Sequence, residues 1–305
     1  MVSHGAHPIL AKKRGETHMR IRIATDSTAD IPVSLRQELD IAVLPLTIIT
    51  EDREYRDGND LTPQEFYPLL DAEDRLPMSA QVNPYQYTEL FEENWKAGYT
   101  DLIQTTLNSK GSSTWQSAIQ ARDLFYEEHP DAKDSFNIHI IDSLNYSMGY
   151  GWAVIAAAKQ VRAGAGVEEI IAGIRDWVEN VRVAAIPLNL KCVRKSGRIS
   201  AAAALIGDAV GIKPVITFEG GEVKTLSKIR GKKKAVSALI ELCKQERRPG
   251  TPYVLARAAD DEEAERLMQA ACAELDQPPE LMFYLGCIIT INIGPEAIGI
   301  IYHKK

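Results

Sequence analysis

A strand-like apolar run passes into a hydroxyl-rich turn in the stretch Leu102-Ile103-Gln104-Thr105-Thr106-Leu107-Asn108-Ser109-Lys110-Gly111-Ser112-Ser113-Thr114. A helical pattern follows and continues to Glu128, just before Pro130. Gly111 gives the turn backbone freedom, and the hydroxyls lie beside the free N–H groups of the first helical turn. Because capping needs only one hydroxyl, the surplus favours an anion receptor at the helix start, with simple capping as the alternative.

Similar polar turns occur twice upstream. Residues 20–25 have the pattern of a strand that ends at Asp26-Ser27-Thr28-Ala29-Asp30, where the residues fit a helix cap and a binding site equally. Ser79 lies in a loop before Asn83-Pro84, an N-cap with proline at the first helical position. A serine in that loop can donate a hydrogen bond to a carboxylate oxygen, worth about 1.5–3 kcal/mol.

Strand and helix patterns alternate through the first half of the chain. Strands are expected at residues 20–25, 42–49, 102–107 and 137–141, and helices at 84–97, 112–128 and 144–163. Such alternation predicts a mostly parallel sheet flanked by helices. In sheets of this kind ligands lie at the carboxyl ends of the strands, where the polar turns fall.

The second half has a different pattern. Strands are expected at residues 181–187, 214–218, 223–226, 252–256, 287–291 and 297–302, and helices at 231–245 and 261–275. Gly220-Gly221 between two of these strands indicates a hairpin. The pattern predicts an α/β sandwich with a mixed sheet.

The chain is expected to form two α/β domains. Its 305 residues are enough for two, and the break Ala163-Gly164-Ala165-Gly166 ends the helical pattern that precedes it. We assign residues 20–160 to an N-terminal domain and residues 161–305 to a C-terminal domain. Residues 1–19 are polar and aperiodic, and are interpreted as a disordered extension or tag.

Composition excludes several classes of function. The net charge of −7 argues against nucleic-acid binding, which needs a basic face. The four cysteines are widely spaced and the histidines isolated, so no metal is expected and the thiols fit a reducing cytoplasm. No apolar stretch is long enough to cross a bilayer, so stable membrane insertion is not expected. No nucleophile–base motif or phosphate loop occurs, so we expect neither a cofactor nor catalysis.

Two basic runs stand out against the acidic total. Lys195-Ser196-Gly197-Arg198 precedes an apolar stretch rich in small residues, which fits the entrance to a site for an amphiphile or, alternatively, a solvated face. Arg230-Gly231-Lys232-Lys233-Lys234 fits an exposed helix start or a docking surface for a partner.

These motifs, in this order and spacing, resemble the DegV family of bacterial fatty-acid-binding proteins. The resemblance extends from about residue 20 to residue 302. The motifs that carry it include the turns at 23–30, 79–84 and 109–118, Ile141-Asp142-Ser143, the runs at 195–200 and 230–233, Ile212-Lys213-Pro214, Val223 and Gly294-Pro295.

The resemblance implies two α/β domains with a long-chain fatty acid held near their interface. It implies that the acyl chain is buried, that hydroxyls hold the carboxylate, and that a separate fatty-acid kinase subunit receives the bound acid. The residues assigned to the ligand are Asp26, Ser27, Ser79, Ser112, Ser113, Thr114, Arg198 and Asn292. Those assigned to partner docking are Lys195, Arg230, Lys232 and Lys233.

Four positions depart from the family pattern. Ser79 replaces a usual threonine and Ser113 a usual glycine, while Asn292 and Glu296 stand where the family commonly has His-x-Gly-Pro-Gly. An asparagine cannot offer the charge-assisted bond of a protonated histidine. The sequence thus predicts a cytoplasmic fatty-acid-binding protein without catalysis. The alternatives are a phosphotransferase-like or acyl-transfer enzyme, in which Asp26 or Ser112 reacts, and a partner-binding regulator.

Overall fold

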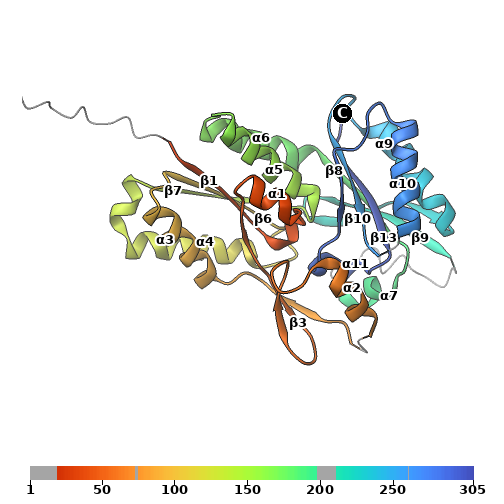
Figure 1. The fold of residues 1–305 in the computed structure, drawn as a ribbon, viewed down its shortest axis with the longest axis horizontal. Coiled ribbons are helices and arrows are strands. Elements are labelled where there is room, and N and C mark those ends of the chain that lie inside the picture. The colour runs from red at the N-terminus through yellow and green to blue at the C-terminus, as the bar shows by residue number, and fades with distance from the viewer. Residues whose placement is uncertain (1–18, 73–74, 198–210, 260) are drawn as a thin grey trace, which may run out of the picture.

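The computed structural model describes residues 19–72, 75–197, 211–259 and 261–305. Figure 1 shows a parallel sheet on the left of the molecule and a mixed sheet on the right, with helices packed around both. These two sheets confirm the predicted α/β architecture.

The parallel sheet comes from the first half of the chain. Within the described residues its strand order is β2-β1-β6-β7, with β2 at Ala42–Leu44, β1 at Ile21–Asp26, β6 at Asp101–Thr106 and β7 at Asn137–Asp142. All of β6 is buried, as expected for a central strand with helices on both faces. The predicted polar turns follow the carboxyl ends of β1 and β6.

Helices cover this sheet. Those that follow or precede its strands are α1 (Val33–Glu38), α3 (Pro84–Lys96), α4 (Thr114–Glu128) and α5 (Met148–Arg162), with single turns η1 (Ser27–Ala29) and η2 (Pro130–Asp134). α6 (Val167–Asn180) follows α5 and packs against it. Asn83 begins α3 with a capping box: it accepts from the Gln86 N–H at 3.0 Å, and the Gln86 side chain accepts from the Asn83 N–H at 3.0 Å. An N-cap of this kind is worth about 1 kcal/mol.

The expected single strand at residues 42–49 is wrong, because the chain changes sheets at Pro45. β2 ends at Leu44, and the chain continues as β3 (Thr47–Ile49) in a small antiparallel sheet of order β4-β3-β5. Its other strands are β4 (Glu54–Arg56) and β5 (Met78–Ala80), and α2 (Pro63–Ala72) lies between them in sequence. Proline has no N–H to donate to a ladder, so the strand breaks there.

The mixed sheet comes from the second half. Among the described residues its order is β10-β9-β8-β13-β11-β12, with bounds β10 Glu222–Arg230, β9 Ile212–Glu219, β8 Val181–Pro187, β13 Ala297–His303, β11 Tyr253–Arg257 and β12 Leu281–Tyr284. Its outer face packs against α9 (Ala235–Glu246), which follows η3 (Lys232–Lys234), and α10 (Asp261–Glu274). β9 and β10 form the predicted hairpin.

The predicted strand at residues 287–291 is wrong, because these residues form the helix α11 (Cys287–Ile293). Five of its residues are buried, among them Ile288 and Ile291. A helix that is covered on nearly all sides is apolar all round and has no amphipathic period. When such a helix is short, its sequence has the same continuous apolar pattern as a buried strand. α7 (Lys191–Ser196) and α11 lie on the inner side of the mixed sheet (Figure 1).

Side chains of the mixed sheet point alternately to its two faces, and this divides the core into two clusters. On β8, Val181 and Val183 join the large cluster shared with the parallel sheet, whereas Ala184 and Ile186 join a smaller cluster under α9 and α10. The large cluster therefore contains side chains from both halves of the chain.

Candidate ligand-binding site

A cavity of about 230 Å³ lies between the inner face of the mixed sheet, α11 and the polar turns of the first half. Most of its wall is apolar. The apolar side chains come from the mixed sheet, from α11 and from its approach, and include Val183, Ile216, Phe218, Val223, Leu285, Ile288, Ile289, Ile293 and Ile301.

Small residues form the centre of the cavity floor, which is the part of its wall that the mixed sheet provides. Gly299 on β13 pairs directly with Ala185 on β8 and with Ala256 on β11, and all three line the cavity. A Cβ on Gly299 would come within 3.0 Å of the Ala184 carbonyl oxygen, so the position has no room for a side chain without a shift. The cavity thus has an apolar floor with little side-chain volume at its centre.

The polar end of the cavity contains three of the residues that the sequence assigned to the ligand. Ser79 on β5 and Ser112 and Ser113 before α4 all line the cavity. Ser112 Oγ lies 2.9 Å from Thr114 Oγ1 and accepts from the Thr114 N–H at 3.3 Å. Thr114 is fully buried and is not among the lining residues, so it supports Ser112 from behind.

The start of α4 adds positive polarity at this end. Ser113 occupies the N-cap position, and its side chain makes no capping bond. The free N–H groups of a helix's first turn carry its positive dipole end, which favours an anion there. Ser112 and Ser113 therefore place hydroxyls in the cavity beside a field that suits a carboxylate.

Asp26 and Ser27 lie behind the cavity wall and are not among its lining residues. Asp26 is fully buried and accepts from the Thr28 N–H at 3.1 Å, the Leu107 N–H at 2.8 Å and the Tyr150 hydroxyl at 2.7 Å. Burial raises the pKa of the Asp26 carboxyl, and these hydrogen bonds lower it in part. Asp26 thereby joins the turn after β1 to the turn after β6.

Ser27 has a comparable role. Its hydroxyl accepts from the Leu46 N–H at 3.0 Å, which attaches the start of β3 to the turn after β1. The neighbouring residue Thr28 does line the cavity, as do Tyr146 and Ser147 before α5. The sequence left the turn that contains Thr28 open between a cap and a binding site. It did not select Thr28, Tyr146 or Ser147, because a loop position alone carries no signal of which way a side chain points.

Asn292 lines the cavity from α11. Its Nδ2 donates to the Ile288 carbonyl at 2.8 Å, so the amide is oriented by its own helix. Glu296 is not among the lining residues, and it accepts from Asn189 Nδ2 at 3.0 Å. The negative charge of Glu296 is therefore held away from the described cavity wall.

The predicted docking cations lie at the surface. Lys195, Arg230 and Lys233 are exposed, and Lys232 is half-buried. Arg198, assigned to the ligand from sequence, lies outside the described residues. Among the described lining residues, Tyr146 alone carries an ionisable side chain, so this part of the wall offers hydrogen bonds and no acid–base pair.

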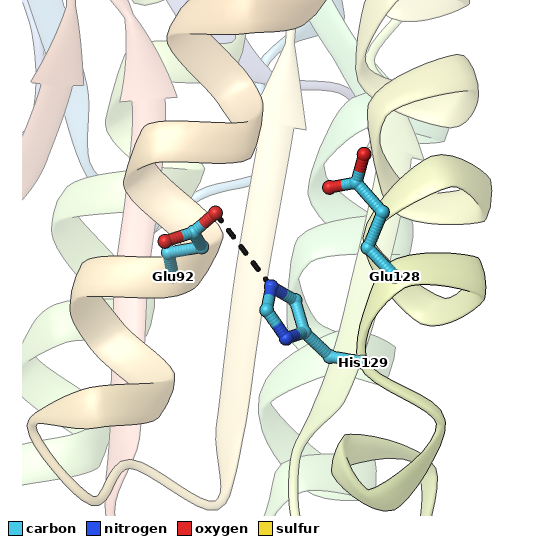
Figure 2. Close-up of side chains that lie close together, drawn as sticks. All are labelled: Glu92, Glu128 and His129. Atoms are coloured by element: carbon cyan, nitrogen blue, oxygen red, sulfur yellow. Dashed lines mark ion pairs between the residues drawn. The ribbon is translucent and has the colours of Figure 1, made fainter.

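A group of possible metal ligands lies elsewhere. Figure 2 shows Glu92 on α3 with Glu128 and His129 at the end of α4, and their ligand atoms lie within 4.8 Å of one another. His129 Nε2 is 3.6 Å from Glu92, and Glu92 also pairs with Lys96. None of the three lines the cavity, and the Lys96 ammonium already takes the place of a cation at Glu92.

Among the described helices, none combines the length and apolarity that a membrane span requires.

Comparison with known proteins identifies the family and the fold of this chain. A family model described as an uncharacterised protein of the DegV family matches residues 20–305. A DegV domain-containing protein of Caldanaerobacter subterraneus subsp. tengcongensis is 34% identical over 293 residues, which cover 94% of this chain and 99% of the relative.

Two solved structures are similar over the same extent. A fatty-acid-binding DegV family protein from Thermus thermophilus has a TM-score of 0.83 at 26% identity, over 94% of this chain and 100% of its own. DegV of Bacillus subtilis, described as a fatty acid binding protein, has a TM-score of 0.80 at 27% identity over the same shares. The family model and the relative together show that this chain belongs to the DegV family.

Proposed function

We propose that this protein binds a long-chain fatty acid in the cavity between the mixed sheet and α11. The observation that carries the proposal is the division of the wall into an apolar floor and an end with hydroxyls beside the start of α4. A fatty acid has the matching division between acyl chain and carboxylate. The two structural relatives described as fatty-acid-binding support the same ligand class.

The carboxylate is proposed to lie at Ser79, Ser112 and Ser113, with the α4 N-terminus balancing its charge. The acyl chain then crosses the small residues Ala185 and Gly299. Asn292 replaces a histidine of the family and supplies neutral hydrogen bonds where the family has a group that can be charged.

The protein is proposed to carry its ligand and not to transform it. The described lining residues contain no acid–base pair, so a separate kinase subunit is proposed to act on the presented carboxylate. Lys195, Arg230, Lys232 and Lys233 are proposed to dock that partner. All four cysteines lie among the described residues and none forms a disulfide, which fits a cytoplasmic location. The proposed domain boundary near residue 160 falls in the sequence between β7, a strand of the parallel sheet, and β8, a strand of the mixed sheet.

The head-group assignment is tested by Ser79→Ala and Ser112→Ala. Each should weaken fatty-acid binding by about 1–3 kcal/mol, because a ligand oxygen loses its partner in a buried site. Native mass spectrometry with solvent extraction identifies the bound acid, and titration of delipidated protein with that acid gives the affinity. Ser34→Ala, at an exposed position of α1, is the control and should leave affinity unchanged.

Unchanged affinity in both cavity variants would remove the carboxylate from this end. Turnover of ATP or of an acyl ester by the chain alone would contradict a purely carrying role. Charge reversal at Arg230 and Lys233 should abolish kinase binding and leave fatty-acid uptake intact, which separates docking from the cavity.

A further inference from the structure

The β9–β10 hairpin forms part of the cavity wall. Ile216 and Phe218 on β9 and Val223 on β10 all face the cavity. The two strands pair along the hairpin from Glu222 with Glu219 to Arg230 with Ile212, with one bulge on the way. The hairpin is therefore a well-paired unit that covers the ligand site.

Its backbone pairing to the rest of the mixed sheet is much sparser. β8 and β9 share a single register pair, Ala185 with Ile216. The next strand pair, β8 with β13, is in register along the whole of both strands. Since an antiparallel ladder derives its strength from consecutive pairs, the tip of the hairpin can leave β8 with few backbone bonds broken. Farther from the tip, Arg182 Nη1 donates to Thr217 Oγ1 at 3.2 Å and Lys213 donates to the Leu188 carbonyl, which keeps β9 in place there.

Side chains hold the hairpin tip instead. Asn108 Nδ2 donates to the Gly221 carbonyl at 2.7 Å, and the ring of Tyr146 lies 4.7 Å from that of Phe218. Asn108 begins the same turn that carries Ser112 and Ser113. The tip thus closes directly against the polar end of the cavity.

Two ion pairs complete this attachment. Lys110 Nζ lies 3.6 Å from Glu222, and Arg182 donates to Glu219 at 2.8 Å. Both glutamates are about half exposed, at 61% and 47%. The Lys110–Glu222 pair is exposed on both sides, so it is weak and is screened by salt. Arg182 is buried and also donates to Glu246, so it stays in place when its bond to Glu219 breaks.

The base of the hairpin has the features of a hinge. Gly211 and Gly231 flank the two strands, and the Gly231 N–H donates to the Gly211 carbonyl at 2.9 Å. Both glycines have a φ of 84°, in the left-handed region that glycine enters without strain. Rotation at such positions moves the hairpin while its internal pairing remains.

We propose that the β9–β10 hairpin is a flap that opens at its tip to admit and release the fatty acid. The inference rests on the proposed function and adds the route by which the ligand exchanges. It predicts that contacts at the tip govern the rates of uptake and release more than the affinity.

The direct test is a reversible tether. Lys110→Cys and Glu222→Cys, in a Cys272→Ser background, are joined by a short bis-methanethiosulfonate linker. Each thiolate forms a disulfide with the linker and displaces methanesulfinate, and a reductant cleaves both disulfides. With cis-parinaric acid as the fluorescent probe, uptake and release should both slow by roughly tenfold or more in the tethered protein, a factor that corresponds to about 1.4 kcal/mol in the barrier. Cleavage of the linker should restore both rates.

The matched control joins another surface ion pair. Lys244→Cys and Glu274→Cys link α9 to α10 on the outer side of the mixed sheet, and this tether should leave the rates unchanged. A second variant needs no tether: Glu219→Gln removes a tip ion pair and should speed both uptake and release with a smaller change in Kd.

Equal rates in the tethered and cleaved proteins would overturn the flap, as would slowing by the control tether alone. Failure of the wild-type protein to bind cis-parinaric acid or any extracted fatty acid would instead overturn the proposed function. The two failures are therefore distinguishable.

Discussion

At the scale of single residues, buried carboxylates organise the polar end of the cavity from behind. Asp30 accepts from the Ser147 hydroxyl at 2.5 Å, and Ser147 lines the cavity. Burial, with the nearby charge of Asp57, raises the pKa of Asp30 well above its usual range, although the Ser147 bond lowers it in part. The same effect of burial raises the pKa of Asp26 and Asp57.

Asp30→Asn tests this directly. A carboxyl whose pKa is raised on folding contributes stability that is fully present below its ordinary pKa and is lost as pH rises through the folded pKa. Asparagine does not titrate and tolerates the left-handed φ of 53°, so the variant should gain stability relative to wild type as pH rises from 4 to 8. Urea midpoints across that range measure it. Asp40→Asn, at an exposed position with a φ of 54°, controls for the backbone, and parallel wild-type and Asp30→Asn profiles would contradict the prediction.

Residue-level reasoning from sequence selected Ser112 and Ser113 because they lie at a helix start, and Ser79 because its loop leads to the N-cap at Asn83; all three line the cavity. The cavity position of Ser147 has no such pattern. Its φ of 55° and the N–H bond to the Thr28 carbonyl exist only once β1 and α5 are packed together.

At the scale of elements, the glycines of α5 allow it to pack closely on the turn after β1. A Cβ on Gly151 would lie 2.2 Å from the Ala29 carbonyl oxygen, whereas one on Gly173 in α6 would meet only the end of the Gln160 side chain at 3.4 Å. Both glycines are inside helices, where alanine is favoured by about 1 kcal/mol.

Gly173→Ala should therefore stabilise the protein by about 0.5–1 kcal/mol. Gly151→Ala should destabilise it by about 1–3 kcal/mol, since the backbone oxygen it meets cannot turn aside as a side chain can. Chemical denaturation of the two variants measures both. A stabilising Gly151→Ala would show that α5 does not approach Ala29 so closely.

Elements were predicted correctly from the sequence where one local sequence motif specified the structure. The N-cap at Asn83 and the hairpin at Gly220-Gly221 depend on local chemistry and were correctly predicted. Prediction failed at α11 and at Pro45, where the outcome depends on what covers the segment and on a change of sheet. Both are properties of tertiary packing.

At the scale of the whole molecule, the cavity joins the two halves of the chain. Its wall takes Thr28, Ser79 and Ser112 from the first half and Val183, Asn292 and Ile301 from the second. The large core cluster also spans both halves, with Tyr67 donating to the Leu285 carbonyl at 2.6 Å across it. A ligand in the cavity contacts both halves at once and binds only when they are assembled.

Delipidated protein should therefore be less stable than loaded protein, and by an amount set by mass action. With free fatty acid at a hundred times Kd, the free energy of unfolding should rise by about 2.7 kcal/mol, because the unfolded chain has no assembled cavity. Urea denaturation of delipidated protein with and without added acid measures the shift. Ser112→Ala, whose affinity is expected to be weaker, should gain less at the same acid concentration. A gain equal in both proteins would show that the acid stabilises the fold from outside the cavity, whereas a gain that scales with each measured Kd ties the stability of the assembled halves to this site.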